Sequence, residues 1–390
     1  MDPALNPYSP GAGRPPAALV GRDPELRAWA VALQRIEEGR GVQPMALYGL
    51  RGVGKTVLLG RMANTAGRQR WVVAQIEAAA ARSLAAALSA ALYSPLTDLR
   101  TESATGRVLR ALKTALSFKV SHDTSGTWNF GVDLDRVAGG AADTGSIEQD
   151  LGEVIRDVAE AVHQARGTGL ALLIDEAQEL TLEELTALCS AAHAAAQREW
   201  PFVLALAGLP SLPATLASAK SYAERQFDYR PIGPLPVSES IDALTRPAAA
   251  QNVTWEPEAV EYLAGAAAGY PYFIQQYGQE AWNSAPGPRI TTADALMGEA
   301  RGQAALDAGF FRSRWDRATA AERDYLRAIA TFGDQASTGD AAQVLRKTHR
   351  SLGPTRSNLI EKGLLYAPEH GVIAFTVPGM SGFIGRQVTG

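Results

Sequence analysis

Residues 49–56 read Gly-Leu-Arg-Gly-Val-Gly-Lys-Thr and match the pattern G-x-x-x-x-G-K-[ST]. A short apolar run over residues 44–48 precedes the motif and a helical pattern follows it, so the motif stands between a predicted strand and a predicted helix. Glycines allow such a loop to wrap a phosphate, with backbone N–H groups and the positive end of the helix facing the anion. The motif predicts a nucleotide-phosphate site; the alternative is a glycine-rich turn that ends in a helix cap.

Each position of this loop has an expected task. The Lys55 ammonium is expected to reach the β- and γ-phosphates, and the Thr56 hydroxyl is expected to ligate Mg²⁺. The residues expected to bind the nucleotide through the loop are Gly49, Gly52, Val53, Gly54, Lys55, Thr56 and Val57.

A second motif supplies the carboxylates that a Mg²⁺-dependent nucleotide hydrolase needs. Residues 170–174 form a continuous apolar run, as in a strand covered on both faces, and the run ends in Asp175 and Glu176. Asp175 is expected to hold the Mg²⁺ shell, and Glu176 to orient or deprotonate the attacking water. The alternative is a strand that ends in two solvated acids.

Composition narrows the remaining possibilities. A chain of 390 residues has room for two or three domains, and a formal net charge of −4 argues against a protein coated in basic residues. One cysteine permits no intrachain disulfide, and no apolar run approaches the length that spans a bilayer. These features favour a cytoplasmic protein without a membrane contact, where ATP and Mg²⁺ are available. Residues 1–17, rich in Pro, Gly and Ala, are expected to form a flexible tail.

The block at residues 19–26, Leu-Val-Gly-Arg-Asp-Pro-Glu-Leu, resembles the V-G-R-x-x-E-L box that precedes the phosphate loop in AAA+ ATPases of the origin-recognition (initiator-like) type and in the related STAND ATPases. The resemblance implies that Val20, Gly21 and Arg22 form part of an adenine pocket, and hence that the nucleotide is ATP. It also implies an α/β fold: a P-loop AAA+ core with a parallel sheet, an α-helical lid and a C-terminal winged helix-turn-helix.

On this resemblance the chain divides into segments. Residues 18–235 are expected to be the ATPase core, 236–317 the helical lid with a linker helix, and 318–390 the winged helix domain. The core carries an insert at about 95–146, in which residues 118–134 alternate between apolar and polar side chains, as in a β-hairpin. That hairpin is expected to pack on its own domain or to contact a partner.

Three further positions follow from the resemblance. AAA+ enzymes place a polar residue at the end of the strand predicted at 202–207, but here that end is Ala207-Gly208, with Ser211 as the nearest hydroxyl. Arg225 matches the arginine finger that acts on a neighbouring subunit of an oligomer, with an ordinary surface arginine as the alternative. Pro271 matches the proline that packs on the nucleotide in STAND proteins, with simple helix punctuation as the alternative.

The segment from residue 318 to the C-terminus has a weak excess of basic residues. From residue 318 onward there are eight Lys or Arg and six Asp or Glu, a net charge of 8 − 6 = +2. Contact with double-stranded DNA is expected through Arg346, Lys347, Arg350, Arg356, Asn358 and Lys362. A protein-docking or purely structural domain is the alternative.

The sequence therefore predicts an ATP-binding and ATP-hydrolysing switch, in which the nucleotide state controls DNA or partner binding by the C-terminal domain. The alternative is a STAND-like signalling scaffold, with very slow turnover, that binds proteins. A small-molecule kinase is disfavoured, since the predicted lid and winged helix leave no obvious acceptor pocket.

Overall fold

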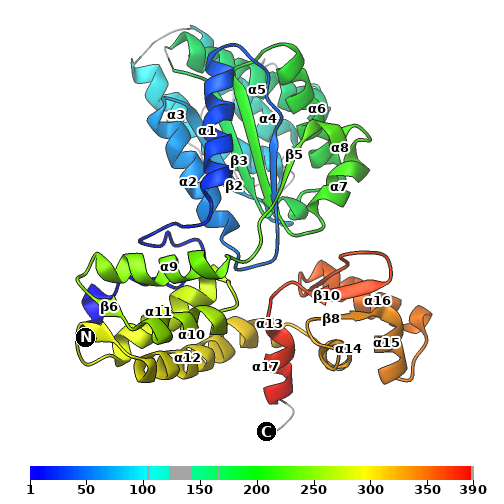
Figure 1. Cartoon of the computed structure of the whole chain (residues 1–390). Coiled ribbons are helices and arrows are strands. Elements are labelled where there is room, and N and C mark those ends of the chain that lie inside the picture. The colour runs from blue at the N-terminus through cyan, green and yellow to red at the C-terminus, as the bar shows by residue number, and fades with distance from the viewer. Residues whose placement is uncertain (103–105, 123–141, 166, 388–390) are drawn as a thin grey trace. The chain divides into compact units, whose positions relative to one another are not determined.

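The computed structural model describes residues 1–102, 106–122, 142–165 and 167–387 (Figure 1). The chain divides into two compact units. The sheet unit comprises Asp23–Tyr48 and Lys55–Pro231, and the helical unit comprises Met1–Arg22, Gly49–Gly54 and Ile232–Gly390. Each unit has its own cluster of buried apolar side chains. Among the described residues, no helix is both long and apolar enough to cross a membrane.

The sheet unit is built on five strands that pair in parallel in the order β2-β3-β4-β1-β5. Their bounds are β1 Met45–Tyr48, β2 Val72–Glu77, β3 Leu170–Asp175, β4 Phe202–Gly208 and β5 Asp228–Pro231. Every residue of β3 and β4 is buried, as expected for strands with helices on both faces. The α/β core with a parallel sheet is confirmed, and its strands all present their carboxyl ends at one edge.

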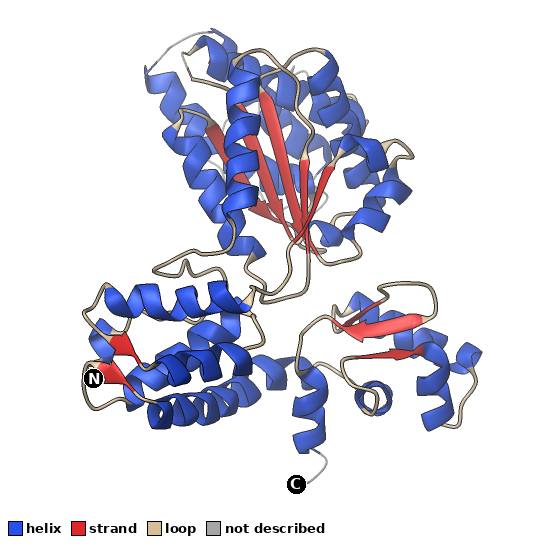
Figure 2. Cartoon of the chain, in the orientation of Figure 1, coloured by secondary structure: helices blue, strands red, loops and turns tan. Residues whose placement is uncertain are grey.

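Helices cover both faces of this sheet (Figure 2). Helices α1 and α2 pack over one face, and α5 and α6 over the other (Figure 1). The helix bounds are α1 Asp23–Glu37, α2 Lys55–Arg68, α3 Leu84–Glu102, α4 Gly106–His122, α5 Ile147–Gln164, α6 Leu182–Gln197, α7 Leu212–Ala219 and α8 Ala223–Gln226. A short 3-10 turn, Ala177–Glu179, follows β3.

The prediction of a strand at the start of the expected β-hairpin is wrong. Residues 118–122 form the last turn of α4 rather than a strand, and residues 123–141 lie outside the described part of the chain. Val108, Ala111, Ala115 and Phe118 are all buried, at the three- and four-residue spacing of one helix face. That apolar stripe extends the helix through Phe118, and it outweighs the local period-two pattern.

The helical unit contains a bundle of four helices with a small parallel strand pair. Its elements are α9 Val237–Ala249, β6 Thr254–Trp255, α10 Pro257–Ala266, α11 Pro271–Ser284, β7 Arg289–Ile290 and α12 Thr292–Leu306. A π-helical turn, Asp307–Phe311, and the short helix α13, Arg312–Trp315, lead out of α12.

The N-terminal segment packs on this bundle, which corrects the expectation of a flexible tail. Residues Pro3–Leu5 form a 3-10 turn, and Tyr8 is only 1% exposed. The Tyr8 hydroxyl donates to the Leu244 carbonyl, and the Trp282 indole donates to the Asp2 carbonyl at 3.1 Å. Two aromatic anchors therefore fix a segment whose Pro, Gly and Ala content suggested disorder.

The C-terminal part of the helical unit, where a winged helix domain is predicted, contains helices and a small antiparallel sheet. Its elements are α14 Ala320–Ala330, β8 Gln335–Ser337, α15 Thr338–Val344, α16 His349–Glu361, β9 Leu365–Tyr366, β10 Val372–Phe375 and α17 Met380–Gln387. The strand β8, which the sequence analysis did not predict, joins β9 and β10 in an antiparallel sheet of order β8-β10-β9. The unpredicted helix α17 stacks Phe383 on Phe311, with ring centroids 5.4 Å apart.

Candidate nucleotide-binding site

The carboxyl edge of the parallel sheet carries the predicted phosphate and metal residues of the sheet unit. Lys55 opens α2 and is 8% exposed, whereas the neighbouring Thr56 is exposed in the first turn of the same helix. Asp175 is the last residue of β3 and is 7% exposed. In open α/β sheets, ligands bind outside the carboxyl ends of the strands. The structure thus places these side chains at the edge where a nucleotide is expected.

Glu176 follows Asp175 in an unusual backbone conformation. Its φ and ψ angles are 49° and 39°, in the left-handed region, which costs a residue with a side chain roughly 1–2 kcal/mol. The backbone N–H of Glu176 donates to Asp175 Oδ1 at 2.9 Å. Conformations of this kind gather at functional sites, where the surrounding structure holds them in place.

Gln178 is a neighbour of Glu176 that the sequence analysis missed. Its Nε2 donates to Glu176 Oε2 at 2.5 Å, and its Oε1 accepts from the backbone N–H of Leu209 at 3.0 Å. The carboxamide thus joins the predicted catalytic acid to the end of β4. A polar residue two positions after Glu176 is visible in the sequence, but the hydrogen bond joins it to Leu209, which lies 31 positions later, just after β4.

The end of β4 agrees with the sequence in carrying no polar side chain. Ala207 and Gly208 are buried in the sheet, and Ser211 precedes α7 without a side-chain capping hydrogen bond. A Cβ atom at Gly208 would lie 2.8 Å from Gln178 Oε1. The glycine is therefore the residue that leaves room for the Gln178 carboxamide.

The loop Gly49–Gly54 belongs to the helical unit. Gly52 and Gly54 have φ angles of 85° and 92°, in the left-handed region that glycine adopts without strain. Their spacing in the motif is thus explained by backbone geometry. The predicted loop conformation needs glycine at both positions.

Arg22 holds this loop. Its guanidinium donates to the Val53 carbonyl at 3.0 Å, to the Gly233 carbonyl at 2.7 Å and to the Gly21 carbonyl at 3.2 Å, and the residue is 8% exposed. These contacts give Arg22 a structural task, and its predicted place in an adenine pocket stays a prediction. Val20 is buried in the apolar cluster of the helical unit, and its predicted contact with adenine stays a prediction, as does that of Gly21.

Two other contacts join the loop to parts of the helical unit far away in sequence. The N–H of Tyr272, in the first turn of α11, donates to the Gly52 carbonyl at 3.4 Å, and Pro271 Cγ lies 4.0 Å from the position of a Cβ on Gly54. Pro271 therefore lies beside the loop, as its predicted role requires. The N–H of Arg51 donates to the carbonyl of Thr376, just after β10, at 3.0 Å.

The predicted arginine finger lies in the sheet unit. Arg225 is exposed on the short helix α8, and Gln43 Nε2 donates to its backbone carbonyl at 2.9 Å. An exposed guanidinium is available to a second molecule, and the role of Arg225 as an arginine finger stays a prediction.

The predicted DNA residues do not form a uniform group. Arg346, Lys347, Arg350 and Asn358 are exposed in or before α16, and Arg356 is half-buried. Lys362 has a different role, because its ammonium donates to both carboxylate oxygens of the buried Glu322, at 2.9 and 2.7 Å, and to the Arg317 carbonyl at 3.2 Å. Lys362 therefore stabilises the C-terminal part rather than presenting a free charge.

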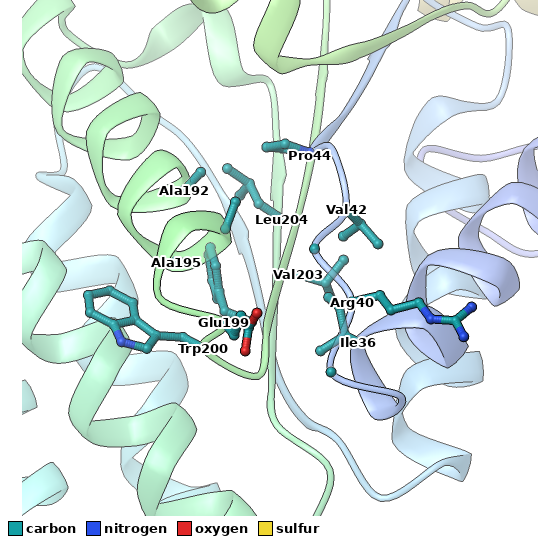
Figure 3. Close-up of a pocket in the computed structure, with 14 residues that line it drawn as sticks. Ile36, Arg40, Val42, Pro44, Ala192, Ala195, Glu199, Trp200, Val203 and Leu204 are labelled. Carbon is teal, nitrogen blue, oxygen red and sulfur yellow. The ribbon is translucent and has the colours of Figure 1, made fainter.

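A crevice in the sheet unit lies at the other edge of the sheet (Figure 3). Pro44, just before β1, lines it, together with Phe202, the first residue of β4, and Trp200. These residues mark the amino-terminal ends of the strands, opposite to Lys55 and Asp175. The crevice is therefore separate from the candidate nucleotide site.

Comparisons with known proteins agree with this geometry. Residues 18–204 match the family model of the AAA ATPase domain, and residues 308–384 match a family described as a domain of unknown function (DUF8462). No curated protein sequence matches the chain significantly.

Among solved structures, the Walker-type ATPase PABY2304 of Pyrococcus abyssi is similar, with a TM-score of 0.57 and 17% sequence identity over 95% of this chain and 98% of that chain. Cdc6p from Pyrobaculum aerophilum gives a TM-score of 0.47 and 14% identity over 100% and 98% of the two chains. The Thermotoga maritima RuvB Holliday junction branch migration motor gives 0.44 and 16% over 95% of each. Scores below 0.5 do not establish a shared fold, and the first similarity establishes only the fold. The match of residues 18–204 to the AAA ATPase domain, the parallel sheet and the two motifs together support an AAA-type ATPase domain in this part of the chain.

Proposed function

We propose that this protein binds ATP with Mg²⁺ at residues 49–56, hydrolyses it, and uses the nucleotide state to control binding by its C-terminal part. One observation carries the proposal: Lys55, which belongs to the phosphate-loop motif, lies at the same carboxyl edge of the parallel sheet as Asp175 and Glu176. Phosphate binding needs only the loop, whereas nucleotide hydrolysis also needs acidic residues for Mg²⁺ and for the attacking water.

The residues present suit a magnesium nucleotide. Mg²⁺ takes one or two protein oxygens and completes its shell with phosphate oxygens and water, and Thr56 and Asp175 offer a hydroxyl and a carboxylate for this purpose. When bound, the ion neutralises charge that develops on the phosphate oxygens. Lys55 adds a positive charge at the β- and γ-phosphates, and Pro271 packs against the nucleotide beside the loop.

Glu176 supplies the remaining step. Its carboxylate accepts a hydrogen bond or a proton from the water that attacks the γ-phosphorus, and so fixes the direction of attack. The left-handed backbone at Glu176 and the hydrogen bond from Gln178 support this role, because both restrict where the carboxylate can lie. Arg225 would supply a charge to the site of a second copy of the chain.

Coupling to the C-terminal part is proposed through the loop itself. The Arg51 N–H that donates to Thr376 belongs to the segment whose backbone must adapt to a phosphate. A loop that moves when ATP binds changes this contact, and the C-terminal part responds. ATP can shift the balance between the two states of the loop by no more than the difference between its binding free energies to them.

We further propose that the C-terminal part is a winged helix domain that binds double-stranded DNA. Support comes from the element order α14, β8, α15, α16 and the β9–β10 hairpin, and from the exposed Arg346, Lys347 and Arg350 around the start of α16. These side chains suit contacts to backbone phosphates. The cytoplasm is the proposed location, because it holds ATP, Mg²⁺ and, in cells without a nucleus, DNA.

A protein partner is the second candidate. The same C-terminal part exposes Phe332, Val344 and Ile360 by 50%, 46% and 39%. Exposed large apolar side chains of this kind are found at protein interfaces. A STAND-like scaffold with slow turnover would use such a surface in place of the basic one.

The first experiment measures ATP hydrolysis by the purified full chain with and without duplex DNA. Lys55→Ala is expected to abolish ATP binding, and Glu176→Gln is expected to keep binding while it stops turnover. Full ATP affinity in Lys55→Ala would refute the site, and unchanged turnover in Glu176→Gln would refute its catalytic role. Tight ATP binding with negligible turnover in both conditions would favour the scaffold.

DNA binding has its own test. The triple variant Arg346→Ala, Lys347→Ala, Arg350→Ala is expected to weaken binding of duplex DNA and to reduce the slope of log affinity against log salt by up to about 3, close to 0.9 per lost phosphate contact. The control replaces the exposed Arg27, Arg61 and Arg68 of α1 and α2, which removes the same charge elsewhere. Equal effects of the two triple variants would leave only a general charge effect and would refute this surface.

A further inference from the structure

The carboxamide of Gln178 has one orientation that satisfies its surroundings. The backbone N–H of Leu209 can only donate, so the atom that faces it at 3.0 Å must be the Gln178 oxygen. The Gln178 nitrogen then faces Glu176 Oε2, at 2.5 Å, and donates to it. The hydrogen-bond partners therefore settle which end of the amide meets the glutamate.

The space around this amide is also specific. A Cβ on Gly208 would approach Gln178 Oε1 to 2.8 Å, closer than side-chain carbons normally come. The last residue of β4 must be small for the bridge to form. Gln178 itself lies in the 3-10 turn Ala177–Glu179 that starts directly after Glu176, so two rigid elements, β3 and β4, define its position.

We infer that Gln178 is a positioning residue, which fixes the Glu176 carboxylate by anchoring it to the end of β4. The inference rests on the proposed function, since it needs Glu176 to act on the attacking water. A glutamate side chain samples several rotamers, and only some of them aim its oxygen at the water. Gln178 is itself held by the end of the buried strand β4. Its hydrogen bond therefore selects one rotamer of Glu176 before the reaction begins.

A purely structural role makes a different prediction. If Gln178 only stabilised its own turn, its loss would lower the thermal stability, and any loss of rate would be independent of Glu176. If it acts through Glu176, its loss has no further effect once that carboxylate has been removed. A double-mutant cycle separates the two roles.

The experiment measures single-turnover ATP hydrolysis and ATP affinity for the wild type, Gln178→Ala, Glu176→Gln and the double variant, all as full chains. Gln178→Ala is expected to lower the rate ~10- to 100-fold with unchanged ATP affinity, the size of effect that a misplacement of about 1 Å produces. The double variant is expected to hydrolyse ATP as slowly as Glu176→Gln. The control is Glu179→Ala, which alters the next side chain of the same turn.

A second variant keeps the inference testable if Gln178→Ala folds poorly. Gln178→Glu has nearly the same shape, but it replaces the donor with a second carboxylate against Glu176. Because a carboxylate cannot donate this hydrogen bond, Gln178→Glu is expected to lower the single-turnover rate with unchanged ATP affinity, and to have no further effect in the Glu176→Gln background. A purely structural role predicts a rate loss of equal size in both backgrounds.

The outcomes are distinct from those of the proposed function. Wild-type rates in both Gln178 variants, or a rate loss of equal size in the wild-type and Glu176→Gln backgrounds, would overturn the positioning role while ATP hydrolysis stood. Absence of turnover in the wild type, or turnover that Glu176→Gln leaves intact, would refute the proposed function and with it the role of Gln178.

Discussion

Arg22 donates a hydrogen bond from its guanidinium to the carbonyl of Val53, at 3.0 Å, and thereby ties the segment before α1 to the phosphate loop. The same guanidinium reaches the carbonyl of Gly233 at 2.7 Å. Backbone carbonyls that turn away from the loop leave its N–H groups to face an anion. Arg22 is therefore expected to support phosphate binding without having to touch the nucleotide.

Replacement of Arg22 by Ala is expected to weaken ATP binding about tenfold or more. Hydrogen bonds from a charged group are each worth roughly 1.5–3 kcal/mol, and about 1.4 kcal/mol is a factor of ten in affinity. Titration calorimetry with ATP measures the effect, and Arg27→Ala, which removes an exposed arginine from α1, is the control. Wild-type affinity in Arg22→Ala would show that the loop keeps its conformation without this clamp.

The sequence is sufficient to place the predicted phosphate and metal residues at one edge of the sheet, because each group of residues is contiguous with a strand or a loop. Lys55 and Thr56 follow the loop directly, and Asp175 and Glu176 directly follow an apolar strand. Parallel strands bring their carboxyl ends to one edge, so strand order is not needed to place these side chains together. Local pattern and a general rule of sheet geometry were sufficient.

The residues that the sequence did not predict correctly depend on distant partners. Gln178 meets Leu209 only because β3 and β4 are adjacent, Lys362 meets Glu322 across the C-terminal part, and Tyr8 meets Leu244 over 236 positions. Charge suggested that Lys362 faces DNA, and composition suggested that Tyr8 lies in a mobile tail. The contacts of Lys362 with Glu322 and of Tyr8 with Leu244 are tertiary contacts, which a local sequence pattern does not predict.

Arg225 is expected to act on a second copy of the chain. Arg225→Ala keeps its own phosphate loop, and Lys55→Ala keeps its arginine, so a mixture should contain interfaces in which both are intact. We expect the mixture to hydrolyse ATP faster than the two variants measured separately, over a range of protein concentrations. A mixture with only the summed activity would argue against an arginine that acts between subunits.

Lys362 is expected to stabilise the C-terminal part in a pH-dependent way. Burial disfavours the charged form of Glu322, but hydrogen bonds from Lys362 and Thr319 outweigh burial and hold the pKa of this carboxyl below its usual value. A depressed pKa in the folded state stabilises the fold at pH values above the unfolded pKa of about 4.3, and this stabilisation disappears as the pH falls through the folded value.

Lys362→Met should therefore destabilise the protein by roughly 1–3 kcal/mol at pH 7, the range for a hydrogen-bonded charge left without its partner, and by less at pH 3. Thermal unfolding at the two pH values measures this difference. Lys347→Met, at an exposed position, is the control. A loss of stability that is equal at both pH values would exclude the ionised pair as its source.

Tyr8 is expected to fix the N-terminal segment to the helical bundle. Its ring is buried, and its hydroxyl donates to the Leu244 carbonyl and accepts from Trp255 Nε1 at 3.1 Å. Truncation of a large buried aromatic side chain costs roughly 3–5 kcal/mol, so Tyr8→Ala should lower the melting temperature and expose residues 1–17 to proteases. Leu5→Ala, at a side chain that is 59% exposed, should change neither.

The hydroxyl adds a dependence on alkaline pH. Burial raises the pKa of Tyr8 above its usual value, although the hydrogen bond from Trp255 acts in the opposite direction. A raised pKa contributes stability that is complete below the unfolded value of about 10 and is lost as the pH rises towards the folded value. Tyr8→Phe keeps the ring and removes this ionisation, so the stability difference between wild type and Tyr8→Phe should shrink as the pH rises from 8 to about 11. Unfolding by urea at each pH provides the measurement, and a difference that stays constant over this range would show that the Tyr8 hydroxyl reaches solvent.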